Sequence, residues 1–305
     1  MNLQKASAVT NLSIIVPVYN EEKRIGRCLE RLLEFSSTND WEIEVVIVDD
    51  GSTDATAEIV KKYESERKFV KLISWQDRQG KGASIKKVAL LSNKDFVCYM
   101  DADLATDPSE FEKLLKFKDE YDVIIGSRLL PGERLCKIQR PLHRSFFSKS
   151  YSLAFRMLFR AQLYDPQCGF KLFRREAFLR IFDNVHSNAF AFDSEVVIKA
   201  LLLGYKVKEV PINWTHMDGS KIKVMDQVLS MGKGLLYIWY DAYMFQEQIH
   251  VLSSSDSWRE DPRKLCRGEI FLRMRKSLRV RKETKCLASQ LTTGQRDENS
   301  SQLSL

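Results

Sequence analysis

Apolar runs of strand length alternate with segments of helical spacing along the first 130 residues. The strand-like runs cover residues 12–19, 42–50, 70–75, 95–103 and 122–128. Between them, apolar residues recur every three or four positions, in residues 20–35, 54–66, 82–92 and 109–118. Strands that alternate with helices pair in parallel through right-handed crossovers. The pattern therefore predicts an α/β fold with a doubly wound, mostly parallel sheet and helices on both faces.

Ligands in such sheets bind beyond the carboxyl ends of the strands, where the connecting loops gather. The loops after the five predicted strands contain, in order, PVYNEE, VDDGSTD, DRQGKGA, DADLATD and GSRLLPGER. Acidic and cationic side chains are thus expected at one edge of the sheet.

Three familiar site classes do not fit this edge. A dinucleotide site needs GxGxxG after the first strand, but PVYNEE stands there. The phosphate-binding pattern GxxxxGK[ST] and the hydrolase pattern GxSxG are both absent from the sequence. The sequence therefore argues against a dinucleotide-dependent enzyme, a P-loop enzyme and an α/β-hydrolase.

The fourth loop carries two carboxylates one residue apart, Asp101 and Asp103, with the small Ala102 between them. In an extended segment residues i and i+2 point to the same side. Hard cations such as Mg²⁺ or Mn²⁺ take oxygen ligands and retain phosphate oxygens in their shell. The pair is therefore a candidate metal site that holds a nucleotide diphosphate. A strand-end turn with two solvated acids is the alternative for this motif taken alone.

Several motifs in order resemble those of family 2 glycosyltransferases of the GT-A type: NLSIIVPVYNEE, VIVDDGSTD, GKGAS and YMDADL. The second half, with LYDPQCGFKLFRREA, AFAFDSEVVIKA and VKEVPINWTHMDGSKI, resembles the dolichyl-phosphate β-glucosyltransferases. The similarity covers roughly residues 12–245. It implies a GT-A nucleotide-sugar transferase fold.

The resemblance also implies an activity: inverting transfer of glucose from UDP-glucose to a polyprenyl (dolichyl) phosphate. The product would be dolichyl β-D-glucosyl phosphate for protein N-glycosylation, with Mg²⁺ or Mn²⁺ as cofactor. Mannosyl transfer from GDP-mannose, or another lipid-phosphate sugar transfer, is the alternative within this class. A non-enzymatic protein that binds nucleic acid or a membrane is the alternative outside it, although no basic stripe with interleaved aromatics supports nucleic-acid binding.

The resemblance assigns nucleotide-sugar contacts to residues in the loops at the edge of the sheet. Tyr19 and Glu21 would meet base and ribose, and Lys81 would approach the diphosphate. The full expected set is Pro17, Tyr19, Glu21, Asp49, Asp50, Asp77, Lys81, Asp101, Ala102, Asp103, Gln167 and Lys221. Plain loop packing is the alternative for Pro17 and Tyr19, and one of Asp49 and Asp50 is expected to be structural.

Two residues are expected to serve catalysis. Arg128 would meet the sugar or the acceptor phosphate, because a planar guanidinium suits that task. Asp193 stands where the family's base is expected. A lipid monophosphate has a second pKa of about 6 and is already largely a dianion at neutral pH, so Asp193 either removes a proton or only orients a substrate.

Further candidates stand beside these residues. Arg134 and Arg140 are candidates for the same phosphate as Arg128, and Glu195 is a second carboxylate beside Asp193. The segment Asp165–Gly169 is expected to shape the sugar pocket, with Cys168 as core filler rather than a nucleophile. Lys221 would lie in a loop that closes over the diphosphate or would be an exposed lysine.

The formal net charge of +7 is concentrated at the end of the chain, where residues 251–305 hold 12 Lys and Arg against 7 Asp and Glu. This segment is polar and is expected to be a disordered tail that binds an anionic surface or has no partner. The expected organisation is a short extension (1–11), the catalytic domain (12–245) and the basic tail (246–305).

The sequence contains no secretory h-region and no run of about 18 uncharged apolar residues. Its six cysteines show no CxxC pair or metal spacing, which suits a reducing compartment. A polyprenol stays in the bilayer, so the expected location is peripheral, at the cytosolic face of the endoplasmic reticulum. Residues 143–160 and 231–245 are candidate interfacial helices, with amphipathic core helices as the alternative.

Overall fold

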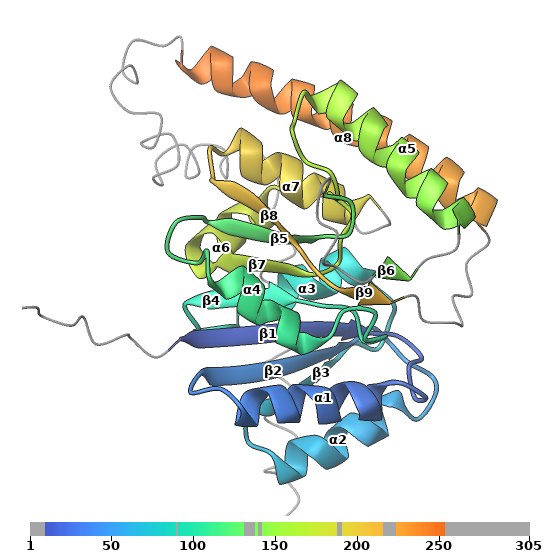
Figure 1. Ribbon diagram of the computed structural model, residues 1–305, viewed down its shortest axis with the longest axis vertical. Coiled ribbons are helices and arrows are strands. Elements are labelled where there is room, and N and C mark those ends of the chain that lie inside the picture. The colour runs from blue at the N-terminus through green and yellow to red at the C-terminus, as the bar shows by residue number, and fades with distance from the viewer. Residues whose placement is uncertain are drawn as a thin grey trace, which may run out of the picture. The chain divides into compact units, whose positions relative to one another are not determined.

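The computed structural model of the 305-residue chain describes residues 10–89, 91–130, 138–139, 142–187, 191–215 and 224–253 (Figure 1). Residues up to Phe245 form one compact unit, and Gln246–Leu305 form a second. Of the second unit, only residues 246–253, at the end of a helix, are described.

A seven-stranded sheet forms the centre of the first unit, in the order β3-β2-β1-β4-β7-β5-β8. The strands are β1 (Asn11–Val18), β2 (Glu42–Asp49), β3 (Val70–Ser74), β4 (Phe96–Tyr99), β5 (Val123–Ser127), β7 (Lys171–Arg174) and β8 (Val207–Pro211). All neighbours pair in parallel except β7, which is antiparallel to both β4 and β5. The expected α/β fold with a mostly parallel sheet is confirmed. A parallel two-stranded ladder joins β6 (Ile138–Gln139) to β9 (Trp214–Thr215).

Helices connect these strands and cover the sheet (Figure 1). They are α1 (Ile25–Ser37), α2 (Thr56–Glu66), α3 (Lys81–Ala89), the short 3-10 helix η1 (Pro108–Glu110), α4 (Phe111–Leu115), α5 (Leu142–Phe159), α6 (Arg175–Asp183), α7 (Phe192–Leu202) and α8 (Val224–Ser253). None of those in the described ranges combines the length and apolar character that crossing a membrane requires.

Two aromatic clusters fill the space between helices and sheet. On one face, Phe111 of α4 stacks on Phe170 with ring centroids 3.9 Å apart and contacts Phe35 of α1. On the other, Phe178 and Phe182 of α6 stack at 3.9 Å and contact Phe173 of β7. Burial of such rings contributes most of the favourable free energy of packing, so these clusters hold the sheet in place beneath the site loops.

The segment after β1 departs from the predicted helix over 20–35, because α1 begins only at Ile25. The backbone N–H of Asn20 donates to Ser52 Oγ at 2.9 Å, and its Oδ1 accepts from Thr53 N at 2.8 Å. The N–H of Glu21 donates to Thr56 Oγ1 at 2.8 Å. These bonds tie the first loop to the second, and residue 20 has a φ of 54°, which prevents a helix from starting there.

The antiparallel strand β7 was not expected from the pattern, and it shapes the site. Lys171 at its start pairs with Tyr99 at the end of β4. The loop that leads into β7 therefore emerges at the same edge as the loop with Asp101. One edge of the sheet thus collects the loops after β1, β2, β4 and β5 and the loop before β7 (Figure 1).

Candidate active site

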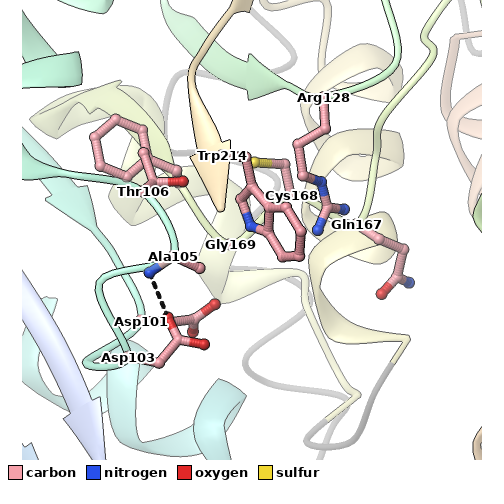
Figure 2. Close-up of a pocket in the computed structure, with 10 residues that line it drawn as sticks. Asp101, Asp103, Ala105, Thr106, Arg128, Gln167, Cys168, Gly169 and Trp214 are labelled. Carbon is pink, nitrogen blue, oxygen red and sulfur yellow. Dashed lines mark hydrogen bonds between the residues drawn. The ribbon is translucent and has the colours of Figure 1, made fainter. Parts of the chain in front are cut away.

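A small recess opens at this edge of the sheet, with a volume of about 60 Å³ (Figure 2). It is lined by Asp101, Asp103, Ala105, Thr106, Arg128, Gln167, Cys168, Gly169, Phe170 and Trp214. Five of the residues expected from the sequence therefore lie at or beside it: Asp101, Ala102, Asp103, Arg128 and Gln167.

Asp101 and Asp103 both line this recess (Figure 2), although β4 ends at Tyr99 and the chain turns at residues 102–103 instead of continuing as an extended segment. Asp103 Oδ1 also accepts a hydrogen bond from Ala105 N at 3.0 Å, which fixes the turn. Burial, and then the negative charge of Asp101, raise the pKa of Asp103. Two carboxylates that repel one another at a polar opening are a suitable place for a divalent cation.

Gly169 makes room for this pair. A Cβ atom at this position would lie 2.4 Å from Asp101 Oδ2 and 3.0 Å from Lys81 Nζ. Any side chain there would displace the carboxylate that faces the recess. The donor set of hard oxygens, and the space left open over Asp101, fit Mg²⁺ or Mn²⁺ with phosphate oxygens completing the shell.

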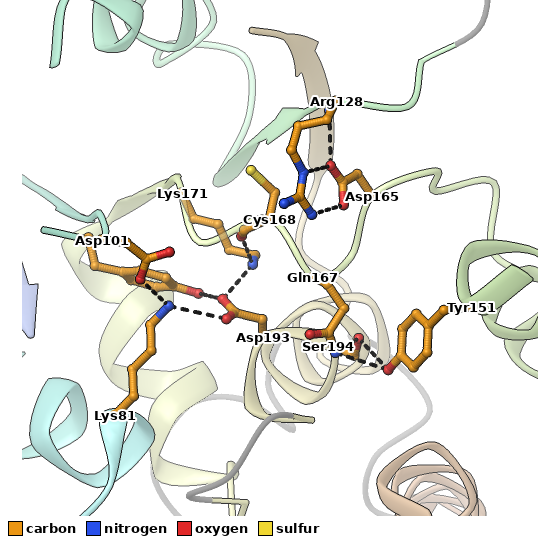
Figure 3. A network of polar contacts seen from close by, with 11 residues as sticks. Lys81, Asp101, Arg128, Tyr151, Asp165, Gln167, Cys168, Lys171, Asp193 and Ser194 are labelled. Carbon is orange, nitrogen blue, oxygen red and sulfur yellow. Dashed lines mark hydrogen bonds and ion pairs between the residues drawn. The ribbon is translucent and has the colours of Figure 1, made fainter. Parts of the chain in front are cut away.

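Asp193 lies at the start of α7 within a network of polar contacts (Figure 3). Its Oδ1 accepts from Lys171 Nζ at 2.8 Å and from the hydroxyl of Tyr99 at 2.7 Å, and its Oδ2 lies 3.4 Å from Lys81 Nζ. Burial alone would raise the pKa of Asp193, but Lys171 and then Lys81 bring it below its usual value. Asp193 is therefore a stable anion that holds two lysines.

Lys81 links this network to the candidate metal site. Its Nζ lies 2.7 Å from Asp101 Oδ1 as well as 3.4 Å from Asp193 Oδ2. Burial lowers the pKa of Lys81, but Asp101 and then Asp193 raise it above its ordinary value, so the side chain is a cation. The contact of Lys81 with a diphosphate remains a prediction, and the structure gives only the distances of its Nζ to Asp101 and Asp193.

Arg128 directly follows β5, and its side chain is held by the carboxylate of Asp165 (Figure 3). Its Nε and Nη2 donate to the two carboxylate oxygens at 2.6 and 2.7 Å, and its backbone N–H donates to Oδ2 at 2.9 Å. The loop that carries Asp165 is fixed in turn by Glu209 of β8, which accepts from the N–H groups of Tyr164 and Asp165 at 2.8 and 2.6 Å. Burial by itself would lower the pKa of Arg128, but the charge and hydrogen bonds of Asp165 raise this pKa above its ordinary value, so the guanidinium stays charged.

The second loop places Asp49 and Asp50 in buried positions with structural contacts. Asp50 accepts from Gln79 N at 2.7 Å, Gly80 N at 2.8 Å and Ser84 Oγ at 2.9 Å. Asp49 Oδ1 accepts from Ser52 N at 3.1 Å. Asp50 thereby fixes the loop that leads into α3, and the contact of Asp49 with a nucleotide remains a prediction.

The first loop presents Tyr19 as an exposed ring, with the guanidinium of Arg78 at 4.1 Å from its centroid. Pro17 is the penultimate residue of β1, and Asp77 is exposed in the loop before α3. Glu21 forms an ion pair with Arg24 at 3.2 Å. The contacts of these side chains with a nucleotide remain predictions.

Other expected residues do not face the recess in the same way. Gln167 lines it, but its Nε2 donates to Tyr151 Oη at 3.0 Å and Ser194 Oγ at 2.9 Å (Figure 3). Glu195 is buried and accepts the N–H groups of His186 and Ser187, so it is structural. Lys221, Arg134 and Arg140 lie outside the described residues.

Cys168 is buried beside the recess, and burial followed by the charge of Asp165 raises the pKa of its thiol to about 12. The three cysteines in the described ranges, Cys28, Cys98 and Cys168, are free. A thiol with so high a pKa is a poor nucleophile at neutral pH, as its sequence context indicated.

Four residues that sequence reasoning did not select contribute to the site: Lys171, Arg78, Trp214 and Lys149. Lys171 stands two positions after Gly169, and its Nζ also donates to the carbonyl of Cys168. The sequence signal for Lys171 was a lysine at the start of the apolar run KLF. Arg78, Trp214 and Lys149 could not be selected in this way, because only the fold shows which residues lie beside them.

A larger cleft of about 560 Å³ lies on the other side of Arg128. It is lined by Arg128, Leu129, Leu130, Lys149, Ser152, Leu153, Arg156 and Tyr164. Arg156 Nε is buried and has no hydrogen-bond partner among the described residues, while its guanidinium lies 4.6 Å from the Tyr164 centroid. The cleft thus combines three cations with leucine side chains, a lining that suits an anion attached to an apolar chain.

One side of α8 packs on the fold, and the other is exposed. Leu235, Ile238 and Ala242 are buried. The exposed side carries large apolar residues, which we call the α8 face: Leu236, Tyr237, Trp239, Tyr240, Tyr243 and Met244. Lys199 of α7 forms a 2.6 Å ion pair with Asp241, which anchors the buried side. Contiguous exposed aromatics on a soluble surface are unusual and mark an interaction site.

Comparisons with known proteins agree with this geometry. Residues 13–182, more than half of the chain, match the family described as "Glycosyl transferase family 2". "Glycosyltransferase AglD" of Haloferax volcanii is 32% identical over 240 residues, which are 77% of this chain but only 38% of that protein. "Dolichyl-phosphate beta-glucosyltransferase" of Dictyostelium discoideum is 32% identical over 241 residues, 74% of this chain and 73% of the relative.

The fold is also shared with a solved structure. Glucosyl-3-phosphoglycerate synthase from Mycobacterium tuberculosis, in complex with Mn²⁺, UDP and phosphoglyceric acid, superposes with a TM-score of 0.57 at 15% identity. The match covers 77% of this chain and 78% of that one. Together with the acidic pair at the end of β4, these similarities show that the chain belongs to glycosyltransferase family 2.

Proposed function

We propose that the chain transfers glucose from UDP-glucose to a polyprenyl phosphate such as dolichyl phosphate, forming dolichyl β-D-glucosyl phosphate for protein N-glycosylation. One observation carries the proposal: Arg128 lines both the acidic recess and the cationic, apolar cleft. A sugar donor in the recess and a lipid phosphate in the cleft would meet at this guanidinium. The name and the coverage of the Dictyostelium relative support glucose and dolichyl phosphate as substrates.

On the donor side, Asp101 and Asp103 would hold Mg²⁺ or Mn²⁺ together with the diphosphate of the donor. The bound cation would stabilise the negative charge that develops on departing UDP. Lys81 would supply a second positive charge to the same phosphates, and Tyr19, Glu21, Asp49 and Asp77 would contact the nucleoside.

On the acceptor side, Arg128, Lys149 and Arg156 would bind the lipid phosphate, and Leu129, Leu130 and Leu153 would contact the first prenyl units. The phosphate oxygen attacks the anomeric carbon from the face opposite UDP, and the bond from that carbon to the UDP oxygen breaks. An α-linked donor thereby becomes a β-linked product, without a covalent intermediate on the enzyme.

No strong base is required in this scheme, since the acceptor phosphate is already largely a dianion near neutral pH. The contacts of Asp193 with Lys171, Tyr99 and Lys81 support a positioning role for this carboxylate instead. Asp193 would keep two lysines oriented toward the phosphates of the reactants.

A polyprenyl acceptor requires the enzyme to work at a bilayer. The α8 face supplies tyrosine and tryptophan side chains, which favour the interface between lipid and water. We therefore place the enzyme peripherally at the cytosolic face of the endoplasmic reticulum membrane, with the α8 face against the lipid headgroups.

The deciding experiment offers the purified protein UDP-glucose, UDP-GlcNAc or GDP-mannose, each radiolabelled, with vesicles that contain dolichyl phosphate and Mg²⁺. Label should enter the lipid phase from UDP-glucose alone, and EDTA should abolish the transfer. Transfer from GDP-mannose instead would overturn the choice of donor. Absence of transfer from all three, with folded protein and intact vesicles, would refute the proposed reaction.

A further inference from the structure

We propose that the ammonium of Lys81 occupies the position of the divalent cation at Asp101 until donor binding displaces it, so that this lysine couples metal binding to nucleotide binding. The proposal rests on the metal site of the proposed function and adds a regulatory residue to it. Lys81 would keep the enzyme from holding a metal ion firmly in the absence of a nucleotide sugar.

The first support is the position of the Lys81 ammonium. Nζ lies 2.7 Å from Asp101 Oδ1, on a carboxylate that faces the recess, and 3.4 Å from Asp193 Oδ2. The missing side chain of Gly169 leaves the space that Nζ and Asp101 use together, since a Cβ there would lie 3.0 Å from Nζ. A metal ion bound to Asp101 would meet this ammonium at close range.

The second support is that Lys81 has a fixed base and a mobile end. It begins α3, and Gly80 before it has a φ of 91°. Asp50 fixes that turn by accepting the N–H of Gly80 at 2.8 Å. Beyond this anchored backbone, four methylene groups allow Nζ to move by several ångströms.

The third support is the asymmetry between the two carboxylates that Lys81 contacts. If Nζ leaves, Asp193 still has Lys171 at 2.8 Å and Tyr99 at 2.7 Å. Asp101 has no other cation among the described salt bridges, and half of its side chain is exposed. Release of Lys81 therefore frees one carboxylate for a metal ion while the other keeps its partners.

Electrostatics then sets the order of events. An ammonium and a divalent cation at the same carboxylate repel each other, and the repulsion is stronger at a partly buried site than in water, so binding of one disfavours the other. A diphosphate that arrives with the metal gives Nζ a new negative partner. Metal alone should bind weakly, metal with nucleotide should bind tightly, and the coupling must be reciprocal.

The test measures Mn²⁺ binding, without turnover, by the electron paramagnetic resonance signal of free Mn²⁺, with and without UDP. Relative to the wild type, Lys81→Met should bind Mn²⁺ alone about tenfold more tightly, because the competing charge is gone. The factor by which UDP strengthens Mn²⁺ binding should fall at least about tenfold, because the contact between lysine and phosphate is lost as well.

Two further variants make the result specific. Lys81→Arg keeps the charge and should bind Mn²⁺ alone as weakly as the wild type. Lys86→Met, on the same helix, should behave as the wild type, because the ammonium of Lys86 donates to the carbonyl of Val185 and does not line the recess. Circular dichroism checks that each variant is folded.

The outcomes separate the two proposals. If the wild type binds Mn²⁺ with UDP but Lys81→Met binds Mn²⁺ alone no more tightly, the role of Lys81 is refuted and the metal site stands. The role is also refuted if Lys81→Arg matches Lys81→Met. If the wild type fails to bind Mn²⁺ even with UDP, the metal site itself is refuted, and the inference fails with it.

Discussion

The guanidinium of Arg128 and the carboxylate of Asp165 meet along two parallel hydrogen bonds of 2.6 and 2.7 Å. This fork-like contact fixes the plane of the guanidinium and keeps it between the recess and the larger cleft. In the proposed function this charge would meet the donor and the acceptor phosphate, and holding it in one orientation before they arrive reduces the entropy lost on binding.

Arg128→Lys should therefore impair transfer although it preserves the charge. A lysine makes one contact with Asp165 where arginine makes two, and it reaches less far over the recess. We expect kcat/KM for the lipid phosphate to fall by about 10- to 100-fold, which corresponds to loss of a charged hydrogen bond. Steady-state kinetics measures it. Arg67→Lys, at an exposed position, is the control, and unchanged kinetics in Arg128→Lys would remove Arg128 from the acceptor site.

The Asp101→Asn/Asp103→Asn double variant should abolish transfer and Mn²⁺ binding together. The neutral amides retain one oxygen each but lose the charge that attracts a divalent cation. Calorimetric titration of Mn²⁺ in the presence of UDP measures the binding. Asp119→Asn alters an exposed carboxylate after α4 and should leave both quantities unchanged. Normal turnover in the double variant would exclude this pair as the metal site.

The pH dependence of transfer should reflect the acceptor rather than Asp193. The lysines and Tyr99 lower the pKa of Asp193, so this carboxyl is ionised throughout the range of about pH 5 to 8 and gains a proton only in stronger acid. The lipid phosphate, in contrast, loses its second charge below about pH 6. We expect kcat/KM to decline below that pH.

Asp193→Asn tests this assignment. The variant should be slower, because Lys81 and Lys171 lose an anionic partner, but it should keep the same acidic decline in its pH–rate profile. Disappearance of the decline in the variant would identify Asp193 as the titrating base. The anion at Asp193 also stabilises the fold above the pKa of an unfolded aspartate, and this contribution is lost as pH falls through its lower folded value.

Gly169→Ala should weaken metal binding without unfolding the protein. The new Cβ would lie 2.4 Å from Asp101 Oδ2, and the carboxylate must rotate away. We expect the affinity for Mn²⁺ in the presence of UDP to fall by about tenfold, as one displaced ligand would predict. Gly26→Ala is the matched control: nothing lies within 4 Å of its Cβ position in α1, so it should stabilise the helix by about 0.5–1 kcal/mol. Wild-type Mn²⁺ affinity in Gly169→Ala would contradict the assigned geometry.

Trp239→Ser/Tyr243→Ser should reduce binding to vesicles. The two rings stack with centroids 6.3 Å apart on the exposed side of α8. Their removal should lower partitioning to vesicles in a flotation assay by about tenfold, given the apolar area of two aromatic side chains. Leu91→Ser, an exposed apolar residue elsewhere, should leave partitioning unchanged. If the double variant floats as well as the wild type, the α8 face is not the membrane contact.

The parallel strands and the acidic pair could be predicted because their signals are local. The run at 96–99 is apolar, and Asp101 and Asp103 follow it closely, so both fall in the loop at the end of that strand. The lysine partners of Asp193 could not be derived in this way. Lys171 lies 22 residues from Asp193, and Lys81 lies 112 residues away. Contacts at such separations depend on strand order, which periodicity does not reveal.

The late strands were missed for a related reason. KLFR is only four residues long and begins and ends with a charged residue, so no periodic pattern distinguishes it from a loop. Its antiparallel direction could not be predicted either, because β7 inserts between β4 and β5, which precede it in the chain. The role of Glu195 could not be decided from the sequence either. The sequence allows it to act beside Asp193, but the structure shows it buried, where it accepts the N–H groups of His186 and Ser187.

The reversed direction of β7 makes the length of the segment before it critical. Side chains alternate between the two faces of a sheet, so a single inserted residue between Gly169 and Lys171 that shifted the pairing of β7 by one position would turn Lys171 toward α4 and Phe173 away from α6. The six residues from Asp165 to Phe170 thus link the candidate site to the core, and a change in their number should disturb both more than a substitution among them.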